Sequence, residues 1–218
     1  MEKVLFIAYN FPPMGGPGVH RSLKFVTNLR NFGYDPIVLT TRKEDVYSNM
    51  HSVDKSLLND VPVDIRIDRL KAYDTLPIFS FLSRLKLYRI FWYLVFPLLW
   101  ERDVLWPILN YQKIKKIASE NDIKLVYTSS GPFSTLWLGY FLKTFNGLKW
   151  IADLRDPCTD GYGFPFPSKV HWYMARRIEK WILGKCDHLI VNTNEVRSLY
   201  IKRKIMKKEN ISTIISGY

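Results

Sequence analysis

The sequence predicts an α/β protein with a doubly wound, mainly parallel sheet of the Rossmann-like type. Short apolar runs with strand character alternate with helical patterns of roughly 10–15 residues, as in repeated βαβ units. The first run, residues 4–8, is almost continuously apolar, which is typical of a central parallel strand buried on both faces. The 218 residues, 47% of them hydrophobic, are enough for one sizeable core, so we expect a single domain over residues 1–218.

The expected elements follow from these patterns in chain order. Strands are predicted at residues 4–8, 36–41, 63–67, 124–128, 149–153, 188–192 and 211–215. Helices are predicted at residues 19–29, 133–145, 169–183 and 195–207. Because parallel strands end at one edge of a sheet, loops 9–21, 128–134 and 153–163 are expected to open together there.

Residues 9–21 combine two prolines, paired glycines and the start of the first predicted helix. Gly15 and Gly16 allow the backbone to approach a ligand closely, and the amides at a helix start attract anions. Six residues separate Ala8 from Gly15, which does not match a dinucleotide-binding motif. Gly18 is not followed by the Lys-Ser/Thr pair of a P-loop. The segment therefore predicts a phosphate site of another type, or only a tight strand-to-helix connection.

The chain carries a formal net charge of +12 and 15% aromatic residues. A basic excess of this size indicates an anionic ligand or surface, although part of it is expected to be solvated surface charge. Nucleic acid is not the expected partner, because no nucleic-acid motif is present and the basic residues are spread over several helices. Anionic lipid and phosphorylated ligands are the favoured classes.

Residues 78–100 superficially resemble a membrane segment. Their longest uncharged run, residues 90–100, is about half of what a membrane span requires. At helical spacing the aromatic and aliphatic residues share one face, flanked by Arg84 and Arg89, which is typical of a helix in the interface of anionic lipid. The alternative is a helix buried in the domain or covered by another domain.

The two cysteines, Cys158 and Cys186, are too far apart for a CxxC pair, and no metal-ligand spacing is present. The apolar run near the N-terminus is too short for a signal peptide. We therefore expect a cytoplasmic protein with no bound metal or other cofactor. Peripheral association with the inner face of a membrane is a further expectation.

Four ordered motifs cover nearly the whole chain. They are residues 9–18 (YNFPPMGGPG), 127–134 (YTSSGPFS), 150–157 (WIADLRDP), and 192–195 with 214–218 at the end. Their order and spacing resemble the N-terminal, acceptor-side domain of retaining glycosyltransferases of family 4, which have the GT-B fold. Each motif alone would be weak, and their combination is fairly specific.

The resemblance implies that residues 1–218 are one half of a two-domain enzyme. The second Rossmann-like domain of that family carries most donor contacts and a pair of glutamates, which this sequence lacks. The implied function is transfer of a sugar from a nucleotide-sugar donor to a glycan or lipid-linked acceptor with retention, with little activity from this half alone. The alternative is a non-catalytic Rossmann-like domain that binds an anionic or glycan ligand.

The resemblance also implies roles for residues in the first loop. The amides of Gly15 and Gly16 are expected to bind the donor phosphate, with Arg21 adding a cation near the pyrophosphate or an anionic acceptor. His20, next to Arg21 in the first helical turn, is expected on the acceptor side. Transfer requires charge stabilisation on the departing phosphate and close placement of the acceptor hydroxyl.

Two later motifs supply the remaining candidates. Ser129 and Ser130 end a predicted strand and are expected to bind acceptor hydroxyls, or alternatively to cap the following helix. Arg155 is expected to contact the acceptor, and Asp156 is the candidate catalytic residue that orients or deprotonates it. The alternative is a structural ion-pair network of Asp153, Arg155 and Asp156.

Overall fold

The computed structural model describes residues 1–42, 52–73, 81, 84, 102–161, 166 and 168–215. The interfacial helix expected at residues 78–100 lies outside the described residues, apart from Phe81 and Arg84. Within the described part of the chain, no helix is long and apolar enough to cross a membrane.

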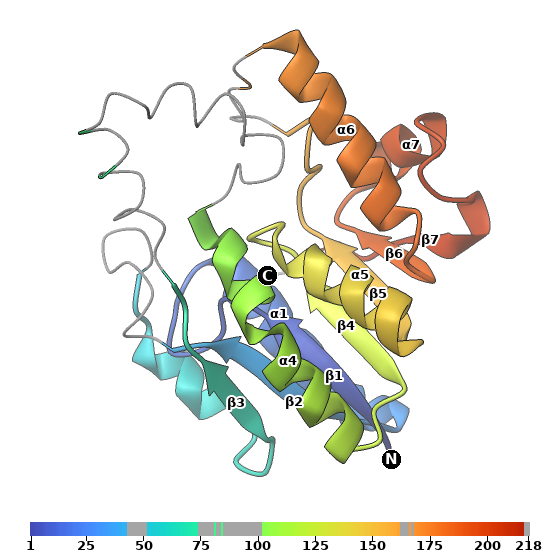
Figure 1. Ribbon diagram of the computed structural model, residues 1–218. Helices are drawn as coiled ribbons and strands as arrows, with labels where there is room; N and C mark the ends of the chain where they lie inside the picture. The colour runs from blue at the N-terminus through green and yellow to red at the C-terminus, as the bar shows by residue number, and fades with distance from the viewer. Residues whose placement is uncertain are drawn as a thin grey trace.

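A seven-stranded, entirely parallel sheet forms the centre of the described structure (Figure 1). Its strand order is β3-β2-β1-β4-β5-β6-β7, so the order reverses between β1 and β4. The strands are β1 (Glu2–Ala8), β2 (Tyr34–Thr41), β3 (Ile67–Leu70), β4 (Leu125–Ser129), β5 (Lys149–Leu154), β6 (His188–Val191) and β7 (Ile211–Thr213). The fold class predicted from the sequence is confirmed.

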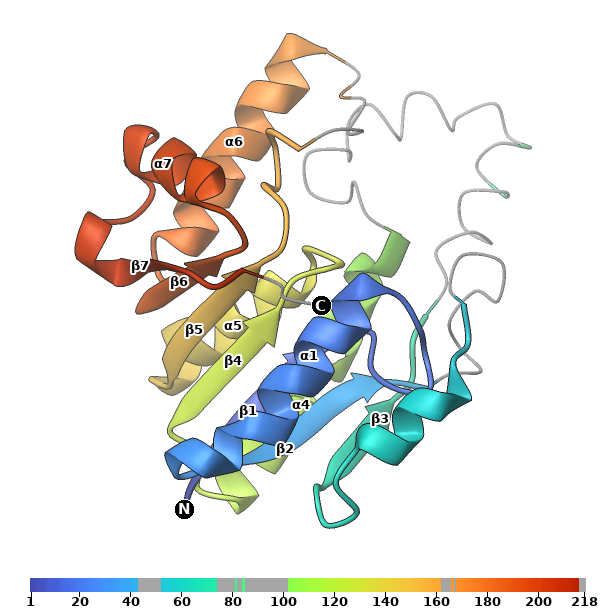
Figure 2. The same cartoon turned by 180° about the vertical axis from the view of Figure 1, so that it is seen from behind.

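Helices cover both faces of the sheet, as a parallel sheet requires. α4 (Leu105–Glu120), α5 (Thr135–Asn146) and α6 (Lys169–Leu183) lie on the face toward the viewer in Figure 1. α1 (Pro17–Asn28) and α7 (Asn194–Lys202) lie on the opposite face, seen in Figure 2. Short 3-10 helices complete the described structure: η1 (Leu29–Phe32), η3 (Lys55–Asp60), η4 (Arg102–Val104) and η5 (Lys208–Asn210).

The core sits on both sides of β1, whose residues from Val4 onward are buried. Phe6 stacks on Tyr127 of β4, with ring centroids 4.6 Å apart. On the other side of β4, the fully buried Trp150 donates a hydrogen bond from its indole to Thr128 Oγ1 at 2.9 Å. A Cβ added to Gly139 would lie 2.1 Å from this indole, so α5 approaches β5 closely only because that residue is glycine.

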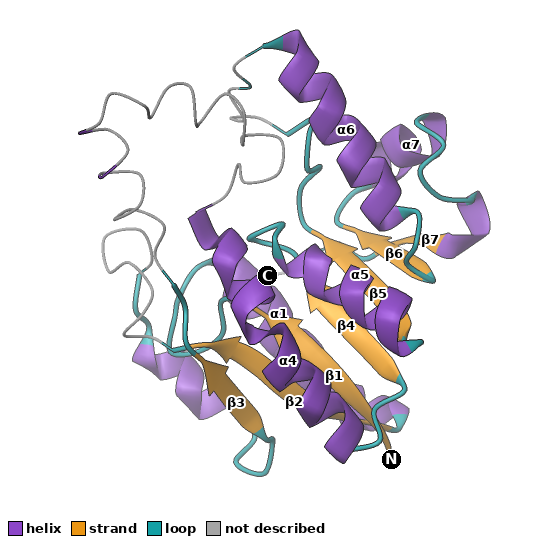
Figure 3. Cartoon of the chain, viewed as in Figure 1, coloured by secondary structure: helices purple, strands orange, loops and turns teal. Residues whose placement is uncertain are grey.

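Several predicted boundaries are wrong, each for a local reason (Figure 3). The third strand was expected at 63–67 but begins at Ile67, because a turn closed by the hydrogen bond from Ile65 N to Pro62 O precedes it. The last helix was expected to reach residue 207 but ends at Lys202, and Lys204 has a φ of 52°. Helix α4 was not predicted, and its Pro107 is tolerated because it lies in the first turn.

Candidate functional site

The loops that follow β1, β4 and β5 meet at the carboxyl edge of the sheet, as predicted from the sequence. They enclose a cavity of about 430 Å³ at the point where the strand order reverses. Ligands of open parallel sheets bind at such a switch point. Segments that line the cavity are residues 9–10, 15–19 and 131–132, together with Ser52, Asp103 and Arg155.

The glycine segment shapes one wall of this cavity. Gly16 precedes α1 with a φ of 105°, a backbone conformation that favours glycine, and Pro17 opens the helix. Gly16 and Gly18 line the cavity, and amides this early in a helix have no acceptor within the helix itself. The amide of Gly15 instead donates to Ser52 O at 2.8 Å. The predicted donor role of the Gly15 amide is therefore corrected, because that group is already bonded within the chain.

Arg21 does not lie free to meet a pyrophosphate, contrary to prediction. Its Nε and Nη2 donate to the two carboxylate oxygens of Asp153 at 2.8 and 2.6 Å, and Nη1 donates to Ile214 O at 2.8 Å. The side chains of this ion pair are 3% and 0% exposed. Burial lowers and the bond to Asp153 raises the pKa of Arg21, with a net upward shift. Asp153 therefore pairs with Arg21. The alternative offered above, an ion-pair network of Asp153, Arg155 and Asp156, has no ion pair to Arg155 among the described residues.

Arg155, in the loop after β5, lines the switch-point cavity and is bonded to the loop after β4. Its Nε donates to Ser130 O at 2.8 Å and its Nη2 to Gly131 O at 3.4 Å. A Cβ added to Gly18 would lie 1.5 Å from Nη1, and one added to Gly131 would lie 1.5 Å from Nη2. Two glycines thus admit the guanidinium between the start of α1 and the loop after β4.

The charge of Arg155 is not neutralised by an ion pair within the described residues. Burial lowers the pKa of Arg155, while the fields of Asp156 and Asp153 oppose that shift and Arg21 adds to it. Arginine remains charged under all ordinary conditions, so this site presents a partly desolvated cation to its cavity. Such a cation favours an anionic ligand.

The two serines at the end of β4 are buried and bonded within the chain. Ser129 Oγ accepts from Ser22 Oγ at 3.1 Å, and Ser130 Oγ accepts from the Arg155 amide at 3.4 Å. Neither hydroxyl caps the following helix, because Ser134 is the cap residue of α5. Ser130 thus accepts from Arg155 through both its carbonyl and its hydroxyl oxygen, and its contact with an acceptor stays a prediction.

His20 and Asp156 lie on a second cavity, of about 720 Å³. This cavity runs along α1 past Phe25 and Leu29, and both predicted residues are exposed at its surface. Arg155 lines both cavities. The structure thus separates His20 and Asp156 from most residues of the switch-point cavity, although the sequence placed all of them in one site.

Polar residues of the switch-point cavity that the sequence analysis did not propose as site residues include Asn10, Asp103 and Tyr9. Asn10 follows β1 directly, and its Oδ1 is buried without a hydrogen-bond partner in the described structure. Asp103 accepts a hydrogen bond from the Tyr9 hydroxyl. The Tyr9 carbonyl in turn accepts from the Thr40 and Thr41 hydroxyls at the end of β2. The position of Asn10 after a buried strand was an available signal, whereas Asp103 reaches the site only through tertiary structure.

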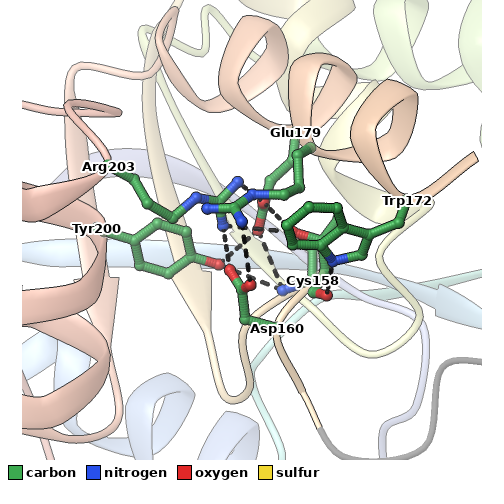
Figure 4. Close-up of polar contacts among 8 residues, drawn as sticks. Cys158, Asp160, Trp172, Glu179, Tyr200 and Arg203 are labelled. Atoms are coloured by element: carbon green, nitrogen blue, oxygen red, sulfur yellow. Dashed lines mark hydrogen bonds and ion pairs between the residues drawn. The ribbon is translucent and has the colours of Figure 1, made fainter. Parts of the chain in front are cut away.

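A buried polar network fixes the loop that follows Arg155 (Figure 4). Glu179 of α6 is fully buried and accepts hydrogen bonds from Tyr200 at 2.7 Å and from the Thr159 hydroxyl at 2.7 Å. Arg203 pairs with Glu179 at 2.5 Å and with Asp160 at 2.6 Å. The loop is therefore bonded to α6 and to the end of α7, which limits the positions that Arg155 can take.

The same network affects ionisation. Burial, together with Cys158 and Glu179, holds the pKa of Tyr200 well above its ordinary value, so its hydroxyl remains a donor. The Cys158 amide also donates to Glu179 Oε1, at 3.2 Å. Among the residues that the structure describes, no group of three or more His, Cys, Asp or Glu side chains is placed to hold a metal ion.

Three comparisons place this chain among known proteins. The model of Glycosyltransferase Family 4 matches residues 18–218. No curated protein matches. Solved structures with the same fold include a glycosyltransferase from Rickettsia africae, with 14% identity and a TM-score of 0.55. The superposition covers 98% of this chain and 42% of the Rickettsia protein.

Two further solved structures with the same fold are enzymes of other organisms. A UDP-GlcNAc 2-epimerase from Methanocaldococcus jannaschii has 9% identity and a TM-score of 0.54, with 98% of this chain and 45% of the epimerase covered. UGT89C1 of Arabidopsis thaliana, complexed with UDP-L-rhamnose, has 12% identity and a TM-score of 0.53, with 98% of this chain and 48% of that enzyme covered. The chain thus spans less than half the length of these neighbours, which show the fold alone.

The family match covers the candidate site from Gly18 onward, including Asp103, Gly131 and Arg155. The strand order and the parallel sheet agree with the N-terminal domain of GT-B enzymes. The resemblance found in the sequence motifs is therefore confirmed. This chain belongs to glycosyltransferase family 4.

Proposed function

We propose that this chain is the acceptor-side half of an enzyme that transfers a sugar from a nucleotide-sugar donor to a glycan or lipid-linked acceptor, with retention of configuration. The observation that carries the proposal is the switch-point cavity, which combines the start of α1 with Arg155, a cation that forms no ion pair with any described residue. The family supports the transferase class, and the UDP-sugar bound to UGT89C1 supports the donor class.

Arg155 stabilises the leaving group in this proposal. A nucleoside diphosphate gains negative charge as the bond to the sugar breaks, and fixed positive groups aimed at that charge lower the barrier. The guanidinium between Gly18 and Gly131 supplies a full charge, and the start of α1 adds the positive end of its dipole. This role passes from Arg21, which is neutralised by Asp153.

The polar wall of the cavity orients the acceptor. Asn10 lines the cavity, and its buried Oδ1 has no hydrogen-bond partner among the described residues, so an acceptor hydroxyl that donates to it removes the cost of a buried unpaired oxygen. Asp103 is the carboxylate that lines the same cavity. Asp156, the catalytic candidate of the sequence analysis, serves this reaction only if the acceptor extends into the second cavity.

Contacts beyond this half complete the proposed site. The solved neighbours are about twice as long as this chain. We assign the remaining donor contacts to a further domain, and we place the enzyme at the inner face of a membrane, where lipid-linked acceptors are met. No metal or other cofactor is part of the proposal.

The test is a transfer assay on the full-length gene product with a panel of nucleotide-sugars and glycan or lipid-linked acceptors. NMR of the product reports the anomeric configuration, which is expected to match that of the donor. Arg155→Ala is expected to lower kcat about 100-fold or more. The matched control is Arg66→Ala, which removes an arginine directly before β3, at the opposite edge of the sheet.

Three results would reject parts of the proposal. Inverted product configuration rejects retention, and full activity of Arg155→Ala rejects its role at the leaving group. Tight binding of a glycan or anion without any turnover favours the alternative function, a non-catalytic binding domain.

A further inference from the structure

The outward face of α6 carries large apolar side chains where a surface helix is normally polar. Val170, Tyr173, Met174 and Trp181 are 62%, 57%, 45% and 50% exposed. They recur along one side of the helix at spacings of three, four and seven to eight residues. The opposite side of α6 is buried against the domain, so this exposed stripe is a second apolar face on the same helix.

Cations lie among these apolar residues. Lys169, Arg177 and Lys180 are exposed, and none of them has an ion-pair partner in the part of the chain that the structure describes. The acidic residue of the helix, Glu179, is buried in the network of Figure 4. The outward face of α6 therefore presents positive charge without compensating negative charge.

The aromatic residues of this face are held in place. Trp181 packs against Tyr140 and Trp137 of α5, with ring centroids 4.6 and 6.0 Å apart. Arg177 lies over the Tyr173 ring at 5.9 Å and donates to its hydroxyl at 3.3 Å. Aromatic rings flanked by cations are characteristic of helices that lie in a membrane interface.

The position of α6 relates this face to the candidate site. In both Figure 1 and Figure 2 the first turns of α6 extend beyond the arrowheads of the strands. The arrowheads mark the edge at which the switch-point cavity lies. A membrane in contact with the first turns of α6 would therefore lie on the same side of the molecule as the switch-point cavity.

We propose that the outward face of α6 docks this protein on an anionic lipid membrane. Charge complementarity selects this occupant, because lipid phosphates neutralise the three cations while the apolar side chains enter the interface. A second copy of the chain is disfavoured, because a two-fold interface would bring together two copies of the same face, each with Lys169, Arg177 and Lys180 and no acidic residue among the exposed side chains of the helix. This inference rests on the proposed function in one respect: docking on a membrane would bring the enzyme to a lipid-linked acceptor.

The test is vesicle co-sedimentation of the full chain, without donor or acceptor. Vesicles of phosphatidylcholine alone are compared with vesicles that also contain about 30 mol% phosphatidylglycerol, which gives the membrane a negative surface charge. Binding is expected mainly to the anionic vesicles. Arg177→Gln combined with Lys180→Gln is expected to weaken it about 30-fold. Met174→Ser is expected to weaken it several-fold at unchanged charge.

The matched control is Lys207→Gln combined with Lys208→Gln, which removes the same charge from an exposed site near η5. This control variant is expected to bind nearly as well as the parent chain. Absence of binding, equal binding to neutral and anionic vesicles, or a larger loss in the control would each overturn the proposal. Self-association that Met174→Ser abolishes, measured by sedimentation, would assign the face to a second copy instead. Vesicle binding without sugar transfer in the full-length enzyme would reject only the proposed function.

Discussion

Two arginines near the start of α1 have opposite environments. Arg21 lies within the helix, is buried, and has all three of its donor nitrogens bonded to Asp153 or to Ile214 O. Arg155 packs against Gly18 from the loop after β5, is held by backbone carbonyls, and has no ion-pair partner in the part of the chain that the structure describes. From this difference we expect the neutralised Arg21 to stabilise the fold, and we propose Arg155, which is held by uncharged acceptors, as the cation that meets a ligand.

The largest effect is expected at the neutralised pair. Asp153→Asn leaves the charge of Arg21 buried without a counterion, which costs about 3–5 kcal/mol of unfolding free energy. Urea denaturation followed by tryptophan fluorescence measures this loss. A change below about 1 kcal/mol would show that Arg21 is not held by its charge partner, and the contrast with Arg155 would fail.

Gly18→Ala tests the Arg155 side without altering any charged residue. A Cβ at position 18 would lie 1.5 Å from Arg155 Nη1, so the guanidinium must move out of its present place. We expect activity of the full-length enzyme to fall about 100-fold. Stability is expected to fall by about 1 kcal/mol, because the displaced guanidinium loses its hydrogen bonds to Ser130 O and Gly131 O, a cost that the helix preference of alanine only partly offsets.

The control for this change is Thr27→Ala, in the same helix but outside both cavities. It is expected to retain activity within about two-fold, the scatter usual for sites without special contacts. Equal activity of the two variants would show that the placement of Arg155 does not matter for transfer.

A smaller effect is expected from Tyr200→Phe, in the network behind the Arg155 loop. The tyrosine hydroxyl donates to Glu179 Oε1, which keeps its contact with the Cys158 amide when the hydroxyl is removed. The expected cost is about 1–2 kcal/mol of unfolding free energy, measured by thermal or urea denaturation. A large loss of activity at unchanged stability would instead mean that this network acts on the site directly.

The smallest effect is expected from Asp156→Asn. This carboxylate is exposed, so its charge is screened and stability is expected to change by no more than about 0.5 kcal/mol. Because Asp156 lines the second cavity, activity is expected to fall less than in Gly18→Ala. A complete loss of transfer would place the acceptor in the second cavity and restore Asp156 as the catalytic residue.

The sequence was sufficient for the parts of the fold that depend on local pattern. Apolar runs predicted β1, β4, β5 and β6 closely, and their parallel order required the loops to meet at one edge. It misplaced β3, because a turn at Pro62 displaces the extended segment by a few residues. It also missed α4, whose apolar residues give only a weak helical periodicity.

The candidate site could be predicted only in outline. The sequence correctly brought the glycine segment and Arg155 to one edge. The partners of Arg21 and of the Gly15 amide could not be predicted, because Asp153 and Ser52 are 132 and 37 residues away and meet them only in the folded chain. An arginine beside a glycine loop therefore indicates an anion-binding site, but the sequence does not show which arginine is already paired with a carboxylate.

The strand order also bears on how the protein is made on the ribosome. β1 pairs with β2 on one side and with β4 on the other, and β4 begins only at Leu125. During synthesis the second edge of β1 therefore lacks its native partner until more than half of the chain has been translated, a delay of several seconds at roughly 5–20 residues per second. In that interval an apolar strand edge is open to pairing with other nascent chains. The insertion of β4 closes this edge and also brings the loop after β4, with residues 131–132, to the switch-point cavity.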